Sequence, residues 1–151
     1  MTGQKLSEET VKLLKECDAG IKIAVRSLDE VLDTVQDVRF KKALKESKDD
    51  HQEIEAEILR LLSKMNQEGK DPSPMAKAMS WTKINFKIMT DQSDRTISEI
   101  IAEGCEMGIK TLEKLKAEYD KADQEAIEIA DKIISLENGL KIRLKEHLSK
   151  D

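Results

Sequence analysis

The chain has 151 residues, of which 38% are charged, 38% are hydrophobic and only 3% are aromatic, and its formal net charge is −5. The scarcity of aromatic residues and prolines argues against a β-sandwich or barrel and favours long helices around one buried core. No run approaches the roughly 18 apolar residues of a membrane span, and the acidic balance gives no reason to expect a nucleic-acid partner. Two cysteines make no disulfide framework and fit a reducing compartment, so we expect a cytoplasmic, all-α protein with a single domain over residues 1–151.

Apolar residues recur at heptad spacing in four long segments, which predicts four helices of similar length. These helices are expected over residues of about 7–35, 38–65, 94–120 and 122–149. Ser7 and Asp37, at the starts of the first and second segments, are residue types that cap helix N-termini. Helices of such matched length, each about 40 Å long at 1.5 Å per residue, are typical of an antiparallel four-helix bundle.

The segment between the second and third helices holds both prolines of the chain. Residues 66–74 contain these prolines and Gly69, which predicts a loop, and a short amphipathic helix is expected over 75–89. A helix of this length spans roughly 22 Å. With a loop on each side, this additional crossover helix would carry the chain from one end of the bundle to the other.

A short internal repeat links the first and third helices. The six residues Cys17–Lys22 recur as Cys105–Lys110, with four identical positions and an acidic residue second in both copies. The repeat indicates a duplicated helical hairpin. Each copy holds a glycine, Gly20 or Gly108, and glycine in a helix costs about 1 kcal/mol relative to alanine. We therefore expect neighbouring helices to approach closely at both glycines.

Several polar residues interrupt the apolar rows near the helix midpoints. His51 lies one heptad from Leu44 and from Ile58, and Glu137 lies one heptad from Ala130. If the two hairpins overlap fully, these polar residues form one layer across the centre of the bundle. The layer would contain Cys17, Asp18, His51, Cys105, Glu106 and Glu137.

With its helix order, its single long crossover and these mid-helix polar positions, the chain resembles the ferritin-like superfamily. It is most similar to an uncharacterised branch of small bacterial bundle proteins that lacks the complete di-iron motif. The family pattern places one Glu on each of two helices and Glu-x-x-His on each of the other two. The resemblance implies that Asp18 and Glu106 match the single carboxylates and that His51 matches one histidine. Lys48 replaces the expected Glu before His51, and Glu137 has no neighbouring His, so a standard di-iron oxidase is not expected.

Two functions for the polar layer stay open. In the leading one, the protein has a non-enzymatic structural or protein-interaction role. His51 is then a core histidine bonded to a carboxylate or to the backbone, and Asp18 and Glu137 are partners of that histidine or of a lysine such as Lys22. In the alternative, His51, Asp18, Glu106 and Glu137 hold a divalent metal such as iron, manganese or zinc in a metal-binding or redox bundle.

A third function rests on the crossover segment. Residues 74–89 carry three lysines and no acidic residue, so the segment is +3 and the rest of the chain is −8. A basic amphipathic helix in this segment could bind an anionic surface, an acidic partner or a second copy of the chain. The last of these would make the protein a homo-oligomer such as a dimer. The candidate interaction residues are Lys77, Lys83, Lys87, Trp81, Ile84 and Ile88.

Overall fold

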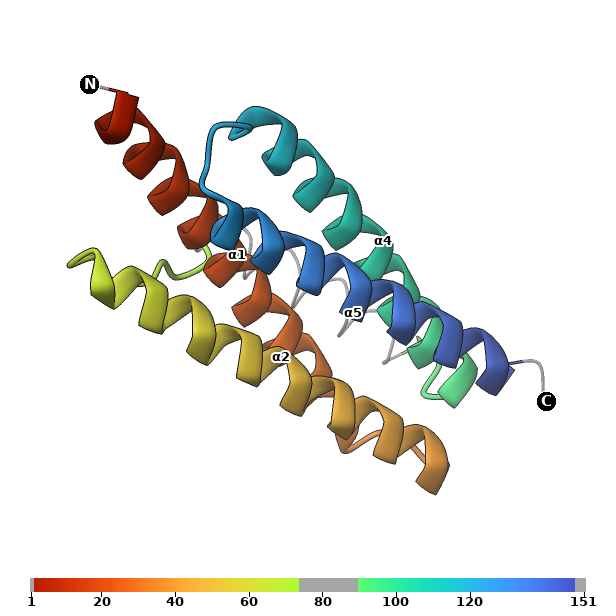
Figure 1. Ribbon diagram of the computed structural model, residues 1–151. Helices are drawn as coiled ribbons and strands as arrows, with labels where there is room; N and C mark the ends of the chain where they lie inside the picture. Colours follow the sequence, from red (N-terminus) through yellow and green to blue (C-terminus); the bar gives the residue numbers. More distant parts are fainter. Residues whose placement is uncertain (1, 74–89, 149–151) are drawn as a thin grey trace.

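The structure is a computed structural model that describes residues 2–73 and 90–148, with side chains over residues 8–73 and 90–147. Four long helices form an antiparallel bundle, as predicted (Figure 1). The crossover helix expected over 75–89 lies outside the described residues. The four helices are α1 (Thr2–Leu32), α2 (Val38–Lys64), α4 (Asp94–Glu118) and α5 (Gln124–Leu148).

Contacts at the helix ends fix the topology. The Asp94 carboxylate at the start of α4 accepts hydrogen bonds from the backbone N–H groups of Gln36 and Asp37, which lie between α1 and α2. The His147 ring near the end of α5 stacks on Phe40 near the start of α2, with ring centroids 4.6 Å apart. The start of α4 therefore lies at the end of the bundle opposite to the end of α2. The chain between these two helices includes residues 74–89, which the structure does not describe, so the long crossover stays a prediction.

Three of the four helices agree with the predicted ranges to within two residues. The Asp37 side chain caps α2 by accepting the Phe40 N–H at 2.9 Å. The first helix differs, because it continues through Ser7 to Thr2 and ends at Leu32. No proline interrupts the residues before Ser7, so the helix propagates past this potential cap.

The end of α1 has a cause outside the helix. Both backbone N–H groups held by Asp94 lie 2.8 Å from its carboxylate oxygens, so residues 36 and 37 leave the helical path. At the opposite end of the bundle, α1 holds the α4–α5 turn in the same manner. Glu9 accepts the N–H of Lys121 at 2.7 Å, and Thr10 accepts the N–H of Asp123 at 2.8 Å. Each hairpin turn is thus fixed by the other hairpin.

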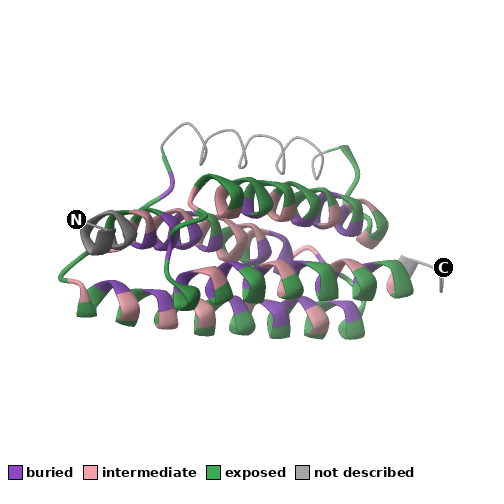
Figure 2. Ribbon diagram, turned by 45° about the horizontal axis from the view of Figure 1, so that its top comes forward, coloured by how far each residue is buried: buried purple, intermediate pink, exposed green. Residues whose placement is uncertain are grey.

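Buried residues lie along the inward faces of the helices (Figure 2). Their apolar side chains form two clusters. The first cluster lies at the α1–α2 turn and holds Leu28, Val31, Leu32, Val35, Phe40, Leu44, Ile97, Ile100, Ile101, Cys105, Leu140 and Leu144. The second lies at the α4–α5 turn and holds Leu13, Leu14, Cys17, Ile21, Ile58, Leu62, Leu112, Ala122, Ala126, Ile129, Ala130 and Ile133.

The expectation of close helix approach at the two repeated glycines is wrong. A Cβ atom built on Gly20 meets no atom of the described residues within 4 Å, because this position of α1 is exposed. A Cβ atom on Gly108 meets only the Glu137 carboxyl carbon, at an ordinary 4.0 Å. The crowded glycine is Gly69 in the loop after α2, where a Cβ would lie 2.4 Å from a carboxylate oxygen of Asp18.

Candidate functional site

A buried polar layer separates the two apolar clusters near the middle of the bundle. Its members come from two helices, with Ser47 and His51 on α2 and Glu137 on α5. All three are buried, and the exposed fractions of His51 and Glu137 are 1% and 7%. The sequence predicted the depth of this layer, because both ionisable residues interrupt apolar heptad rows.

His51 is held at both ring nitrogens. Its Nδ1 lies 2.7 Å from the Ser47 backbone carbonyl oxygen, and its Nε2 lies 2.7 Å from Oε1 of Glu137. A carbonyl oxygen only accepts hydrogen bonds, so Nδ1 carries a hydrogen and donates it. In the charged form of the ring, Nε2 also donates, to the Glu137 carboxylate, and the two side chains form a buried ion pair. The prediction of a core histidine bonded to a carboxylate or to the backbone is confirmed, and His51 makes both contacts.

The surroundings of His51 act on its pKa in opposite directions. Burial alone lowers the pKa, because the charged ring loses water. The hydrogen bond and the negative charge of Glu137 raise it, as does the Ser47 backbone contact, and the net result is a pKa above the usual 6.5. The ion pair therefore keeps His51 charged at higher pH than an isolated histidine.

Both cysteines lie in the core close to acidic groups. Burial, followed by the charge and hydrogen bond of Glu137, raises the pKa of Cys105 well above its ordinary range. Burial and the neighbouring Glu16 and Asp18 raise the pKa of Cys17 to about 12. Because the thiolate is the nucleophile and the metal ligand, both thiols are poorly reactive at neutral pH.

Asp18 occupies a different buried environment beneath the loop after α2. It is fully buried, and its Oδ2 lies 2.9 Å from the Lys22 Nζ and accepts the backbone N–H of Lys70, also at 2.9 Å. Lys22 also contacts Asp71, with 3.1 Å between Nζ and Oδ1. The second oxygen of Asp18, Oδ1, has no hydrogen-bond partner among the described residues. Asp18 therefore ties the loop over residues 69–71 to α1.

The structure brings together two of the four predicted metal ligands. His51 and Glu137 are in contact, whereas Asp18 forms its contacts with Lys22 and the loop. The side chain of Glu106 is 57% exposed and pairs with Lys141 at 3.5 Å, so it lies on the acidic outer face of α4. Within residues 2–73 and 90–148, no group of three or more His, Cys, Asp or Glu residues is placed to hold a metal ion.

Two features of the site have no signal in the sequence. The contact of Lys70 with Asp18 joins residues 52 positions apart, and no periodicity relates a loop to a helix. The use of the Ser47 backbone carbonyl is equally invisible to a pattern of side chains. The six candidate interaction residues on the crossover segment, from Lys77 to Ile88, lie outside the described residues.

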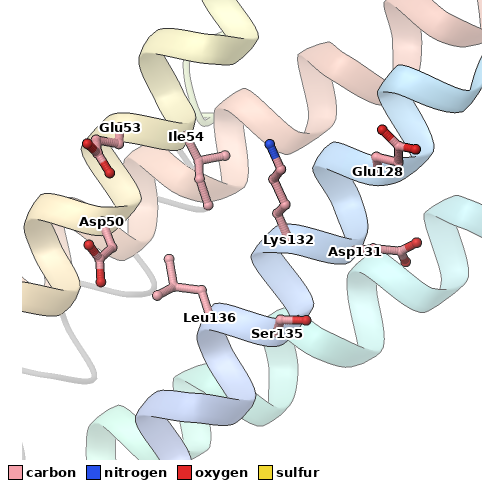
Figure 3. Close-up of a pocket in the computed structure, with 8 residues that line it drawn as sticks. All are labelled: Asp50, Glu53, Ile54, Glu128, Asp131, Lys132, Ser135 and Leu136. Atoms are coloured by element: carbon pink, nitrogen blue, oxygen red, sulfur yellow. The ribbon is translucent and has the colours of Figure 1, made fainter.

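An open groove of about 650 Å³ lies between α2 and α5 (Figure 3). Its two apolar residues, Ile54 from α2 and Leu136 from α5, lie between the helices. Charged residues surround them on both helices, so the groove is apolar at its floor and mainly acidic at its edges. The remaining lining residues are Asp50, Glu53, Glu128, Asp131, Lys132 and Ser135.

Comparison with known proteins identifies the fold. No protein-family model matches the chain, and no curated protein matches it. The structure of YcfI, "a putative structural protein from Rhodopseudomonas palustris", is similar with a TM-score of 0.75 at 10% identity, over 93% of this chain and 92% of that one. Dps from Thermosynechococcus elongatus is similar with a TM-score of 0.64 at 11% identity, over 95% and 92% of the two chains. The chain thus has the ferritin-like four-helix bundle fold that the sequence resemblance implied.

None of the described helices contains an apolar stretch long enough to traverse a membrane.

Proposed function

We propose that this chain is a non-enzymatic structural protein of the cytoplasm that associates with a second copy of itself. The observation that carries the structural role is the closed contact between His51 and Glu137. Both ring nitrogens of His51 are engaged by groups of the same bundle, and both side chains are buried. The pair joins α2 to α5 and faces the core, where it contributes to the arrangement of the helices.

Two further observations support this role. Cys17 and Cys105, the only cysteines of the chain, form no disulfide and are buried, and the pKa of each thiol is raised. These properties fit apolar packing in a reducing compartment better than nucleophilic chemistry. A fold shared over almost the whole chain with YcfI, itself described as a putative structural protein, points in the same direction.

Self-association is supported by the distribution of charge along the chain. The basic segment 74–89 is +3 and carries Trp81, Ile84 and Ile88, while the remaining residues sum to −8. Opposite charges on two parts of one sequence favour contact between copies. Sedimentation equilibrium from low to high micromolar concentration tests this proposal. A mass rising from one chain to two is expected, and a single-chain mass at every concentration would refute self-association.

The metal-binding alternative retains one supporting observation, the contact between an imidazole and a carboxylate. Elemental analysis of untagged protein, purified without chelator and incubated anaerobically with ferrous iron, manganese or zinc, decides between the two functions. The structural proposal expects no metal above background. A stoichiometric ion that His51→Ala loses and Glu106→Ala retains would replace it with a metal site built on the His51–Glu137 pair.

A further inference from the structure

We propose that the groove between α2 and α5 is the docking site for residues 74–89 of a second copy of the chain. This inference rests on the self-association proposed above and identifies the surface that would carry it. The groove combines a partly exposed apolar floor, formed by Ile54 and Leu136, with carboxylates on both flanking helices. Such a surface fits a partner that is apolar at its centre and basic at its edges.

Three of the groove carboxylates have no cationic partner among the residues that the structure describes. Asp50, Glu53 and Glu128 form no ion pair with any residue in the described part of the chain, and all three are exposed. The other two charged lining residues are already neutralised. Asp131 pairs with Lys116 of α4, and Lys132 pairs with Glu57 of α2.

Other carboxylates on α2 do form ion pairs with α5, so the lack of cationic partners is particular to the groove. Glu46 and Glu57 of α2 are bridged to Arg143 and Lys132 of α5, with nitrogen–oxygen distances of 2.9 and 3.0 Å. Along α2, these two bridges flank Asp50 and Glu53, and on α5 Glu128 lies one turn before the bridged Lys132. The three carboxylates without a cationic partner in the described part of the chain give the groove a local charge of −3 that cations of a partner would offset.

The segment over residues 74–89 has the complementary chemistry. It contains three lysines and no acidic residue, which matches the three unpaired carboxylates in number. In the helix that the sequence predicts there, Trp81, Ile84 and Ile88 fall on one face at spacings of three and four residues, with Lys77 one turn before Trp81. That face is an apolar stripe with a basic start, which suits a floor of Ile54 and Leu136.

The dimensions agree as well. The α5 residues that line the groove extend from Glu128 to Leu136, about 12 Å of helix at 1.5 Å per residue, and Trp81 to Ile88 would span roughly 10 Å. Because each chain carries both the groove and the basic segment, each of two copies can place its segment in the groove of the other. Two copies then form two equivalent contacts in a closed dimer, and neither copy leaves an unused groove.

Charge reversal in the full-length protein tests the surface. We expect Asp50→Lys/Glu53→Lys to weaken dimerisation at least tenfold by sedimentation equilibrium, because lysines would then repel the basic segment. The control is Asp33→Lys/Glu113→Lys, which makes the same change in charge at exposed positions outside the groove and should leave the dimerisation constant within about twofold. Circular dichroism spectra would show that both variants retain the helical fold.

A charge swap then distinguishes docking from general repulsion. Lys83→Glu/Lys87→Glu should also be monomeric, since its segment no longer complements the wild-type groove. Mixed with Asp50→Lys/Glu53→Lys, it should form a heterodimer, because each groove then meets a segment of opposite charge. If the wild type dimerises but the groove variant dimerises equally well, this surface is wrong and the proposed self-association stands. If the wild type stays monomeric at all concentrations, both proposals fail.

Discussion

Removing His51 should destabilise the bundle far more than its single side-chain contact suggests. His51→Ala leaves the Glu137 carboxylate in an environment where the residue is only 7% exposed and has lost its cation. Breaking a buried ion pair by deleting one partner typically costs about 3–5 kcal/mol. For a domain of this size each kcal/mol lowers the melting temperature by about 2–4 °C, so a decrease of about 10 °C is expected. The matched control, Glu106→Ala, removes an exposed pair with Lys141 and should cost less than about 1 kcal/mol.

The double variant His51→Leu/Glu137→Met separates burial of a lone charge from loss of packing. It removes both charges and fills the space with apolar groups of similar size, so its stability should recover to within about 1 kcal/mol of the wild type or exceed it. Urea denaturation followed by circular dichroism measures all four proteins. Equal losses in His51→Ala and in the double variant would refute the reasoning, because the loss would then arise from packing rather than from an unpaired carboxylate.

The pH dependence gives a second test of the same pair. The pKa of His51 is above its usual 6.5 in the folded protein, since Glu137 outweighs the effect of burial. The contribution of the charged pair is therefore complete below pH 6.5 and is lost as the pH rises through the raised pKa of the folded state. The free energy of unfolding of the wild type, relative to the double variant, should fall through that window. A relative stability that rises with pH would contradict the assignment.

Three further predictions follow from contacts elsewhere in the bundle. Gly69→Ala should destabilise the protein by about 1–3 kcal/mol in urea denaturation, because its Cβ would lie 2.4 Å from a buried carboxylate oxygen of Asp18. The control Gly20→Ala adds a Cβ at an exposed position of α1 and should stabilise the protein by about 0.5–1 kcal/mol. Asp94→Ala should lower the free energy of unfolding by about 2 kcal/mol, since its carboxylate holds two backbone N–H groups, and the exposed Asp33→Ala should change it by less than about 0.5 kcal/mol. Cys17, with a pKa of about 12, should react with a thiol reagent at pH 8 only at the rate of unfolding; rapid labelling of the native protein would show an accessible thiol.

The sequence predicted the helices because their apolar heptads repeat over almost the whole length of each element. It also predicted the depth of the polar layer, since His51 and Glu137 interrupt those heptads. The end of α1 was predicted three residues too late. That boundary depends on Asp94, which holds the backbone at Gln36 and Asp37 from another hairpin, and local propensity contains no information about so distant a partner.

The prediction that all these polar residues share one layer was wrong for a related reason. Asp18 and Glu106 occupy the same position of the internal repeat, yet Asp18 is fully buried and Glu106 is exposed. The difference arises at Lys70, whose backbone N–H reaches Asp18 from a loop that covers this part of α1. Residues at matching positions of the two six-residue segments therefore acquire different environments when the loops that cover them differ, and sequence similarity between the segments cannot reveal this.

A core made only of Leu and Ile would bury more apolar surface than one divided by an ion pair, so the His51–Glu137 contact needs a reason other than stability. Geometry supplies one. The two apolar clusters lie on either side of the pair, and similar apolar side chains along α2 and α5 could pack in more than one register. Only one register places Nε2 of His51 within 2.7 Å of the Glu137 carboxylate, and a shift by one helical turn would bury both charges without partners. We infer that the pair fixes the alignment of α2 with α5. The same alignment places Asp50 and Glu53 of α2 beside the α5 residues that line the groove, so the interior contact and the proposed docking surface depend on one register.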